Sequence, residues 1–537
     1  MNNLNKTVDY KIENEELKAE NSKLKNRVSE LETLNNWYIE QLRLANLKRF
    51  GSTSEKTDNI DQLSFFNEVE NLADENIPEI KLEEITYKRK KREGQREELY
   101  NGLPTHQIVH ELPENQRVCG QCGGDLHACG HEILRRELEI IPAQVRAVEH
   151  VQTVYSCRDC EKNAGEEKLS LIKSSVPAPV IPNSGIASPS LVSLVLCNKF
   201  VLALPIYRQA QELERIGVKI PKQTLSNWII YVAMRWLILI YNLLHSELLS
   251  QDIGHADETT VQVINEEGRK STQKSYMWVY RTGKDSARPV VLLDYQQTRH
   301  GKHSLNFLKT FEGYLHVDAY AGYRKLENQN VILVECWSHA RRKFDEALKA
   351  MDKKDRAGST AEIGMTYCNK LFKLEDKYTE LGLGSKERFK QRLLESKPIA
   401  EAFFKWVEPL VPVTHSKSKI GRALRYAVNQ QQRLMNFFLD GRLEISNNLA
   451  ENTIRPFAVG RKNWLFIYSE KGADASAIAY SIVQTAQANG LVPFMYLNYL
   501  LQELPNIKAE QQISDYLPWN PEVQKICSLP SQVPAPS

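Results

Sequence analysis

The spacing of apolar residues changes near residue 254, from a helical period to alternation with polar residues. Alternation is typical of strands buried on one face, whereas apolar residues three and four apart are typical of helices. The pattern predicts helices over 304–311, 321–329 and 338–351, and strands over 254–264, 275–282, 287–296, 313–320 and 331–337. We therefore expect an α/β core with a mixed sheet over residues 251–488.

The order of these elements carries further information. Three consecutive strands followed by alternating helix and strand are typical of a ribonuclease H-like fold, in which the first and fourth strands are neighbours. Asp257 lies on the first strand and Asp318 near the end of the fourth, so this topology would bring their carboxylates together. Adjacent carboxylates repel unless a cation neutralises them, and hard oxygen ligands favour Mg²⁺ or Mn²⁺. A third carboxylate would complete a site for two such ions.

The candidate for the third carboxylate follows a long helical segment. Few strand signals follow residue 342, and we expect a helical insertion at about 350–440 before the core resumes. Ser446 or Asn447 then caps a helix that carries Glu451, and Pro456 ends that helix.

Glu451 has a second interpretation. Arg455 stands four residues later on the same helical face, a spacing that allows an ion pair. From the residues alone, that structural pairing is the preferred role of an isolated glutamate.

A heptad repeat covers the N-terminal end of the chain. It predicts a leucine-zipper coiled coil over residues 8–48, and asparagines on its seam favour a two-stranded parallel pair. The narrow, polar seam disfavours the alternative of a single helix packed on its own protein, and we expect a homodimer. Residues 49–105, with a basic run at 88–92, are expected to be a linker. The two seams are Tyr10, Leu17, Leu24, Leu31, Tyr38 and Ala45, and Asn14, Asn21, Val28, Asn35 and Leu42.

Four of the nine cysteines form two CxxC pairs, which are Cys119 with Cys122 and Cys157 with Cys160. Four thiolates in this arrangement can surround one Zn²⁺ ion, and the alternating residues between the pairs can supply strands. We predict a zinc-ribbon-like domain with a structural Zn²⁺ over residues 106–175. The alternatives are a redox pair, which needs only one CxxC, unliganded cysteines, and a ligand set that uses Cys129 with His127 or His131.

A helical region precedes the core. One helix ends near Gly217 and a second begins near Lys222, which makes residues 183–250 a candidate helix-turn-helix region. Many helical hairpins of this kind bind nothing. Asn242 and His245 interrupt the apolar stretch that closes this region, so we interpret the stretch as a buried helix. Residues 489–537 are expected to form a helix on the core, followed by a tail.

Composition narrows the class of protein. With 42% hydrophobic and 26% charged residues the chain is typical of globular proteins, and we expect no apolar run long enough to cross a bilayer. The polar N-terminus lacks the apolar core of a signal peptide, which predicts a cytoplasmic location. A net charge of +3 does not identify a nucleic-acid binder, so DNA contacts would have to come from local patches.

Short motifs in a fixed order resemble a known family. They are KRFGSTSE after the heptads, the two cysteine pairs, LPIYRQ with LERIGV, HADET, VDAYAGY, CWSHARRKF, NNLAENTIRP, GRKNWLF and ANGLVPFMYL. Together they resemble the transposases of the insertion sequence 66 (IS66) family, nearly from end to end. Ser446 and Asn452 occupy places where that family commonly has aspartate and arginine.

The resemblance implies a DDE transposase with Asp257, Asp318 and Glu451 as its catalytic triad. It implies two Mg²⁺ or Mn²⁺ ions, cleavage and strand transfer of double-stranded DNA at transposon ends and target, and accessory proteins of the same element as possible partners. Six residues near the triad are candidate phosphate contacts, which are His339, Arg341, Arg342, Arg455, Arg461 and Lys462.

Structural roles compete with some of these assignments. His339 could cap a helix, and Arg341 and Arg342 could pair with Asp345 and Glu346. Two other functions also fit the pattern. One is a DNA-binding regulator with an inactive nuclease core, and the other is a ribonuclease H-like nuclease that acts on RNA hybrids or junctions.

Overall fold

The computed structural model describes residues 144–156, 172–182, 184–507 and 512–529, with scattered residues between 18 and 133. The chain divides into two units, Met1–Leu103 and Pro104–Ser537. In the first unit, the described residues between 18 and 32 are helical, and their seam residues Leu24, Val28 and Leu31 are exposed in the single chain. An exposed apolar seam is what the predicted zipper requires. The linker, its basic run and the cysteine pairs lie outside the described residues.

The sheet of the second unit has six strands in the order β5-β4-β3-β6-β7, and β8 also pairs with β3. Strands β3, β4 and β5 are antiparallel, whereas β6, β7 and β8 run parallel to their neighbours. The predicted pairing of the first and fourth strands is confirmed, since His255 of β3 stands opposite His316 of β6. This is the mixed sheet of a ribonuclease H-like core. Its strands are β3 Ile253–Asn265, β4 Lys274–Thr282, β5 Val291–Gln296, β6 Gly313–Val317, β7 Val331–Glu335 and β8 Ile467–Ser469.

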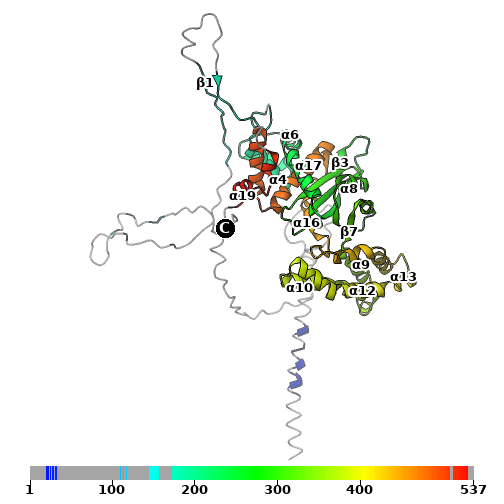
Figure 1. The fold of residues 1–537 in the computed structure, drawn as a ribbon. Coiled ribbons are helices and arrows are strands. Elements are labelled where there is room, and N and C mark those ends of the chain that lie inside the picture. Colours follow the sequence, from blue (N-terminus) through cyan, green and yellow to red (C-terminus); the bar gives the residue numbers. More distant parts are fainter. Residues whose placement is uncertain are drawn as a thin grey trace, which may run out of the picture. The chain divides into compact units, whose positions relative to one another are not determined.

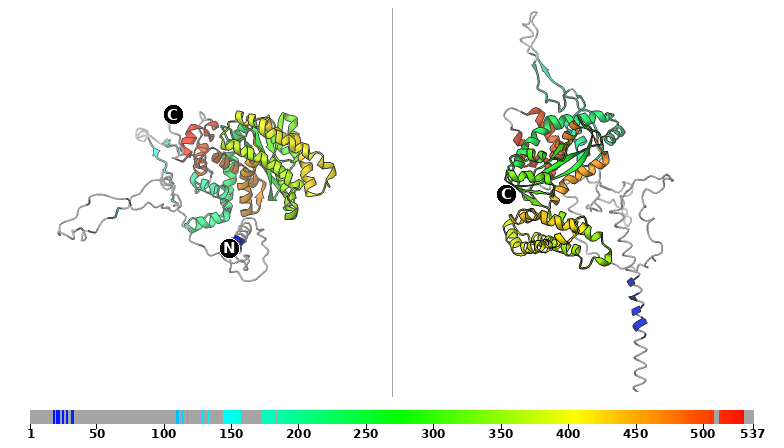
Figure 2. Two further views of the ribbon diagram at one scale, coloured as in Figure 1. Left: turned by 90° about the horizontal axis from the view of Figure 1, so that it is seen from below. Right: turned by 90° about the vertical axis from the view of Figure 1, so that its right-hand side faces the viewer.

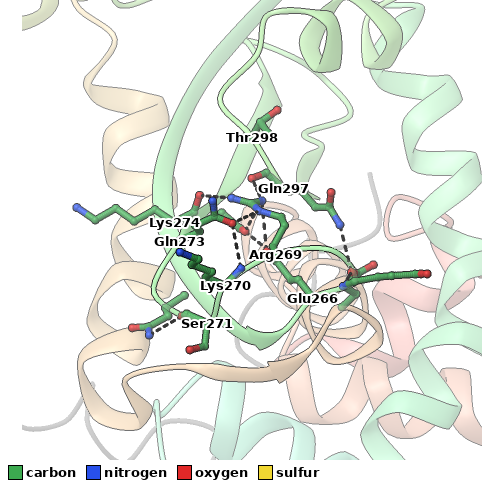
Figure 3. Close-up of polar contacts among 12 residues, drawn as sticks. Glu266, Arg269, Lys270, Ser271, Gln273, Lys274, Gln297 and Thr298 are labelled. Carbon is green, nitrogen blue, oxygen red and sulfur yellow. Dashed lines mark hydrogen bonds and ion pairs between the residues drawn. The ribbon is translucent and has the colours of Figure 1, made fainter.

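The turn between β3 and β4 is closed by a polar network that Figure 3 shows. Gly268 adopts a φ of 72°, which the turn requires and side chains disfavour. Arg269 donates to the Lys274 carbonyl at 3.1 Å and to the Gln297 carbonyl, and forms an ion pair with the buried Glu266 at 3.3 Å. The network therefore fixes the far end of β3, the strand that carries Asp257.

Helices between residues 189 and 249 share one hydrophobic core with the sheet. The predicted helical hairpin is present: α5 (Ile206–Arg215) is followed by Gly217 at φ 89°, and α6 begins at Lys222. Before it, β1 (Val154–Tyr155) and β2 (Ile172–Lys173) form a short antiparallel pair that flanks the second CxxC in sequence. The remaining elements of this region are α4 Pro189–Phe200, α6 Lys222–Val232, a π-helical turn Ala233–Leu237 and α7 Ile238–Leu249.

The run from Lys222 to Leu249 is one continuous helix of 28 residues, and an 18-residue window within it has a mean hydropathy of 1.4, so it is long and apolar enough to cross a membrane by these two measures. The expectation that no apolar run reaches that length is therefore wrong, because α6 and α7 join through the π-helical turn. Core helices of globular proteins meet the same measures. Leu225, Val232 and Leu244 are fully buried in the core that this helix shares with the sheet.

The predicted insertion is helical, and Figures 1 and 2 show its yellow helices gathered beside the green sheet. Its core joins helix residues such as Phe344, Phe403 and Leu424 to Val334 of β7. The Trp337 indole N–H donates to the Leu434 carbonyl at 2.9 Å, which fixes both ends of the insertion together. The helices are α9 Trp337–Lys349, α10 Thr360–Glu380, α11 Ser385–Gln391, α12 Lys397–Val407, α13 Leu410–Val413, α14 Lys419–Asn429 and α15 Gln431–Met435.

Helix α16 (Asn448–Trp464) follows the insertion and corrects two expectations. Pro456 lies inside this helix and does not end it. The bond that the proline removes would be accepted by the carbonyl of Asn452, and both residues are exposed, so water can replace it. Asn447 occupies the N-cap position, but its side chain makes no capping bond because it is used elsewhere.

Helix α17 (Glu470–Ala488) covers the edge strand β5. The hydroxyls of Ser481 and Thr485 accept from the backbone N–H groups of Leu293 and Val291 at 2.7 and 3.0 Å. Capping these groups protects an edge that would otherwise pair with another strand. Two further helices, α18 Pro493–Glu503 and α19 Pro521–Cys527, pack on the same core, as expected for the C-terminal segment.

Candidate active site

The three predicted carboxylates come from three elements of the core. Asp257 lies in β3, Asp318 directly follows β6, and Glu451 lies in the first turn of α16. The pKa of Asp257 is raised to about 7 by burial and by the negative charges of Glu258, Asp318 and Glu451. Asp318 and Glu451 therefore lie close enough to Asp257 for their charges to act on it.

Glu451 faces helix α9. Its carboxylate lies 3.7 Å from Nε2 of His339 and 3.8 Å from a guanidinium nitrogen of Arg342. Burial is the main cause that lowers the pKa of His339, and the charge of Glu451 opposes it. Among the described residues no ion pair joins Glu451 to Arg455, which is exposed, as is Lys462. Glu451 therefore points toward the carboxylates and α9.

Polar contacts fix the start of α16 against the sheet. The buried Asn447 side chain donates to the Ala256 carbonyl at 2.8 Å, and its oxygen accepts from Nδ1 of His255 at 3.0 Å. Arg281 of β4 donates to the Thr453 hydroxyl at 2.7 Å. These bonds set the position of Glu451 relative to Asp257, since Ala256 is the neighbour of Asp257 on β3.

A second network surrounds Asp318 and was not foreseen. Arg299 donates through Nε to Glu258 at 2.7 Å, and its Nη2 lies 3.6 Å from the Asp318 carboxylate. The Tyr323 hydroxyl donates to the other Glu258 oxygen at 2.5 Å, and the Arg299 guanidinium lies 4.0 Å from the Tyr320 ring centre. Burial and the charge of Asp318 raise the pKa of Glu258. Glu258 thus anchors a cation beside Asp318.

Cys336 also lies at the site. Its sulfur, a ring nitrogen of His339 and a carboxylate oxygen of Glu451 all lie within 4.8 Å of one another. The buried thiol accepts from the backbone N–H of Asn447 at 3.1 Å, and burial raises its pKa. Like the Asn447 side chain, the neutral thiol helps to hold the start of α16, because it accepts a backbone hydrogen bond there.

The other predicted residues are divided between the site and its surroundings. The Arg341 guanidinium lies over the Phe372 ring of α10, 5.3 Å from its centre. Asp345 pairs with Lys349 at 2.7 Å. Arg341 is thus placed to hold α9 against α10, whereas Arg342 is the arginine of this pair that lies beside Glu451.

Arg461 lies along β3 from the carboxylates. Its guanidinium donates to the hydroxyls of Thr259 and Thr260 at 3.4 and 3.1 Å. Trp464 is partly buried and packs against the core, with the Lys199 ammonium 4.2 Å from its ring centre. Arg461 of α16 therefore places a cation beside β3, the strand that carries Asp257.

The residues present fit a divalent cation. All three donors are carboxylates, the ligands that Mg²⁺ and Mn²⁺ prefer. Oε1 of Glu451 is buried and has no hydrogen-bond partner, and the same is true of Nδ1 of His339. A buried acceptor without a donor is costly, and a bound cation would satisfy it.

Comparison with known families agrees with this geometry. The family model described as "Transposase IS66 family" matches residues 184–475, which is more than half of the chain. The chain belongs to the IS66 family of transposases. Three further models of this family match: the "zinc-finger binding domain of transposase IS66" over residues 116–161, the "IS66 C-terminal element" over 481–519, and the leucine-zipper model described as "Transposase C of IS166 homeodomain" over 37–108.

Similar curated proteins come from Sinorhizobium fredii (strain NBRC 101917 / NGR234). The uncharacterized protein y4jD is 28% identical over 431 residues, which cover 78% of this chain and 80% of that protein. The uncharacterized protein y4hP is 26% identical over 433 residues, with 78% and 75% covered. The uncharacterized protein y4qI is 28% identical over 433 residues, with 78% and 77% covered.

The family membership confirms the resemblance seen in the motifs. A DDE transposase domain implies a polynucleotidyl transferase that binds DNA and uses a divalent metal. The zinc-finger model indicates a structural zinc, and the leucine-zipper model indicates oligomerisation. These matches name no site residue.

Proposed function

We propose that this IS66 transposase binds the ends of its own element and cleaves DNA there with Asp257, Asp318 and Glu451. The observation that supports the proposal is the approach of three carboxylates, from β3, from the residue after β6 and from α16, together with a buried oxygen of Glu451 that accepts no hydrogen bond. Three acidic groups at one place are unfavourable without a cation. They are therefore arranged for binding two Mg²⁺ or Mn²⁺ ions.

When bound, such ions would activate water for strand cleavage and stabilise the attacking and leaving oxygens of the phosphodiester. The three carboxylates would hold them, with Glu451 kept in place by the bonds of Asn447 and Arg281. Arg342 and His339 face Glu451 from α9 and are partly exposed, so they can contact the phosphate of the cut strand. The 3′-hydroxyl released by cleavage would then attack target DNA.

The N-terminal half is proposed to select the DNA. The α5–α6 hairpin and the zinc-binding domain with Cys119, Cys122, Cys157 and Cys160 would contact the terminal repeats, and the zipper would pair two chains so that two ends are held together. Accessory proteins of the same element are possible further partners. The chain would act in the cytoplasm, where the DNA of the bacterial nucleoid is its substrate.

A nicking assay tests the proposal. Purified full-length protein, Mg²⁺ and an end-labelled duplex from the inverted repeats that flank the gene should give a nick at the repeat boundary. Asp257→Asn should not nick but should bind the same duplex. If neither protein nicked the duplex but both bound it, the chain would be a DNA-binding regulator. Preferential cleavage of RNA–DNA hybrids would indicate a nuclease of another class. Either result would overturn the proposed function.

A further inference from the structure

The loop after α4 and the segment that leads from α16 into β8 carry exposed apolar side chains that nothing in the proposed function uses. We call this cluster the apolar tip and define it as Leu202, Leu465, Phe466 and Tyr468, whose exposed fractions are 68%, 67%, 46% and 71%. The side-chain amide of Asn463 donates to the Ala203 carbonyl at 2.8 Å, which joins the two loops. Exposed apolar residues are ordinary when scattered, but a joined group marks a contact surface.

The backbone of both loops is strained. Ala203 and Leu465 have φ values of 55° and 65°, and among the described residues the third non-glycine residue with positive φ is Asn330. Asparagine tolerates this region, whereas leucine with a positive φ is a true outlier. Strain of this kind persists where the surrounding structure imposes it, typically at functional sites. Two strained residues in two bonded loops therefore mark one site.

The tip stands on a rigid base. A Cβ added to Gly460 would lie 2.3 Å from the Trp464 ring and 2.6 Å from the Tyr480 hydroxyl, so α16 is closely packed just before the tip. Strand β8 then pairs Ile467 with Val263 of β3. Since neighbouring strand residues point to opposite faces, Phe466 and Tyr468 share the face opposite to Ile467.

The charge of the segment that carries Leu465, Phe466 and Tyr468 favours a polyanion over a second copy of the same surface. Residues 455–471 contain four basic residues, Arg455, Arg461, Lys462 and Lys471, and one acidic residue, Glu470, so their net charge is 4 − 1 = +3. That equals the net charge of the whole chain, +3. The Glu470 carboxylate accepts from the Glu267 backbone N–H at 2.9 Å and is turned into the β3–β4 hairpin. Two such surfaces would repel each other, whereas DNA would be attracted.

Strand β3 fixes how far the tip lies from the cutting site. Asp257 and Val263 are six positions apart on this strand, which corresponds to about 20 Å at about 3.3 Å per residue. In duplex DNA with about 3.4 Å per base pair, this distance is roughly six base pairs. Arg461, bonded to Thr259 and Thr260, lies between the two points, where it can contact the intervening backbone.

We propose that the apolar tip packs against unstacked bases of the transposon end, about six base pairs from the phosphodiester that is cut at Asp257. The proposal rests on the proposed function, because it takes DNA at the carboxylate site as given. Exposed aromatic side chains beside basic residues are the chemistry that binds unpaired bases, since every base has an apolar face. The tip would hold the end open and set its register.

Fluorescence of 2-aminopurine tests the proposal. The base analogue is placed in turn at each position of a duplex from the flanking inverted repeat, and its emission rises when the base leaves the stack. Wild-type protein should give the largest rise about six base pairs from the nick. Phe466→Ala and Tyr468→Ala should abolish the rise and weaken binding about tenfold each. Leu394→Ala, which removes a leucine that is 71% exposed on the insertion, is the matched control and should change neither.

A second variant separates contact from folding. Glycine accepts a positive φ without strain, so Leu465→Gly should unfold at the same or a higher temperature than wild type while losing base opening. Binding and nicking by wild type without any base opening would overturn the tip proposal alone. The proposal would also be overturned if Phe466→Ala and wild type had different molecular masses in light scattering without DNA, because the tip would then be a protein interface. Wild type that neither binds nor nicks would remove the proposed function, and this proposal with it.

Discussion

Replacing Asn447 with alanine tests how α16 is held against the sheet. The buried carboxamide makes two bonds, at 2.8 Å to the Ala256 carbonyl and at 3.0 Å to His255 Nδ1. Alanine leaves both partners buried and unpaired, and each unmade bond costs about 1–3 kcal/mol. The free energy of unfolding should therefore fall by about 2–6 kcal/mol.

Urea-induced unfolding of the full chain, followed by tryptophan fluorescence, measures this loss. The neighbouring Asn448 is exposed and provides the matched control, since Asn448→Ala should change the free energy of unfolding by less than about 0.5 kcal/mol. Where Asn447→Ala is still folded, its nicking rate should drop by about a hundredfold, because Glu451 is displaced from the site. Equal unfolding midpoints for the two variants would refute this account of how α16 is held.

Three further predictions concern other parts of the chain. Cys119→Ser and Cys160→Ser should each release the bound zinc, measured as metal content of the purified protein, and full zinc retention would remove these cysteines from the ligand set. Leu31→Glu should convert the expected dimer into a monomer in light scattering, because it places a charge on the zipper seam; an unchanged mass would contradict the zipper. Burial lowers the pKa of His316, and that of His255 to about 3, whereas unfolded histidine titrates near about 6.5. The stabilisation that these two histidines contribute while neutral is fully present above about pH 6.5. It declines as the pH falls below that value, because the unfolded chain then binds more protons than the folded chain. Since the carboxyl of Asp257, whose pKa is raised to about 7, contributes in the opposite direction over the same range, the test is the difference between wild type and His255→Gln. The stability lead of wild type over His255→Gln should shrink between about pH 7.5 and 5.5, and a lead independent of pH would contradict the prediction.

Much of the fold could be predicted because alternation and order suffice for it. The strands of the core alternate clearly, and the pairing of β3 with β6 follows from element order alone. Strand β8 was not predictable, because three residues are too few to show a period. The prediction that Pro456 ends its helix was wrong because a proline's effect depends on whether the carbonyl that it leaves unpaired reaches water. That exposure is a property of the folded helix.

The active site could be predicted only in part from the sequence. Asp257 and Asp318 follow from strand order, whereas Glu451 required the family resemblance, because a long insertion separates it from the sheet in sequence. The bonds that join Asn447 to β3 and Arg299 to Glu258 connect residues far apart in the chain. No local pattern marks such pairs, although Asn447 stands within one of the motifs that carried the resemblance.

The most direct test of the triad is Glu451→Gln, assayed for Mg²⁺-dependent nicking of the terminal repeat and for Mn²⁺ binding by calorimetry. The change removes the charge of the carboxylate whose buried Oε1 accepts no hydrogen bond. We expect weakened Mn²⁺ binding and nicking reduced about a hundredfold or more, since a lost metal ligand removes several kcal/mol of transition-state stabilisation. Glu380→Gln, at the exposed end of α10, should behave as wild type. A Glu451→Gln protein with full nicking and full Mn²⁺ binding would contradict the triad.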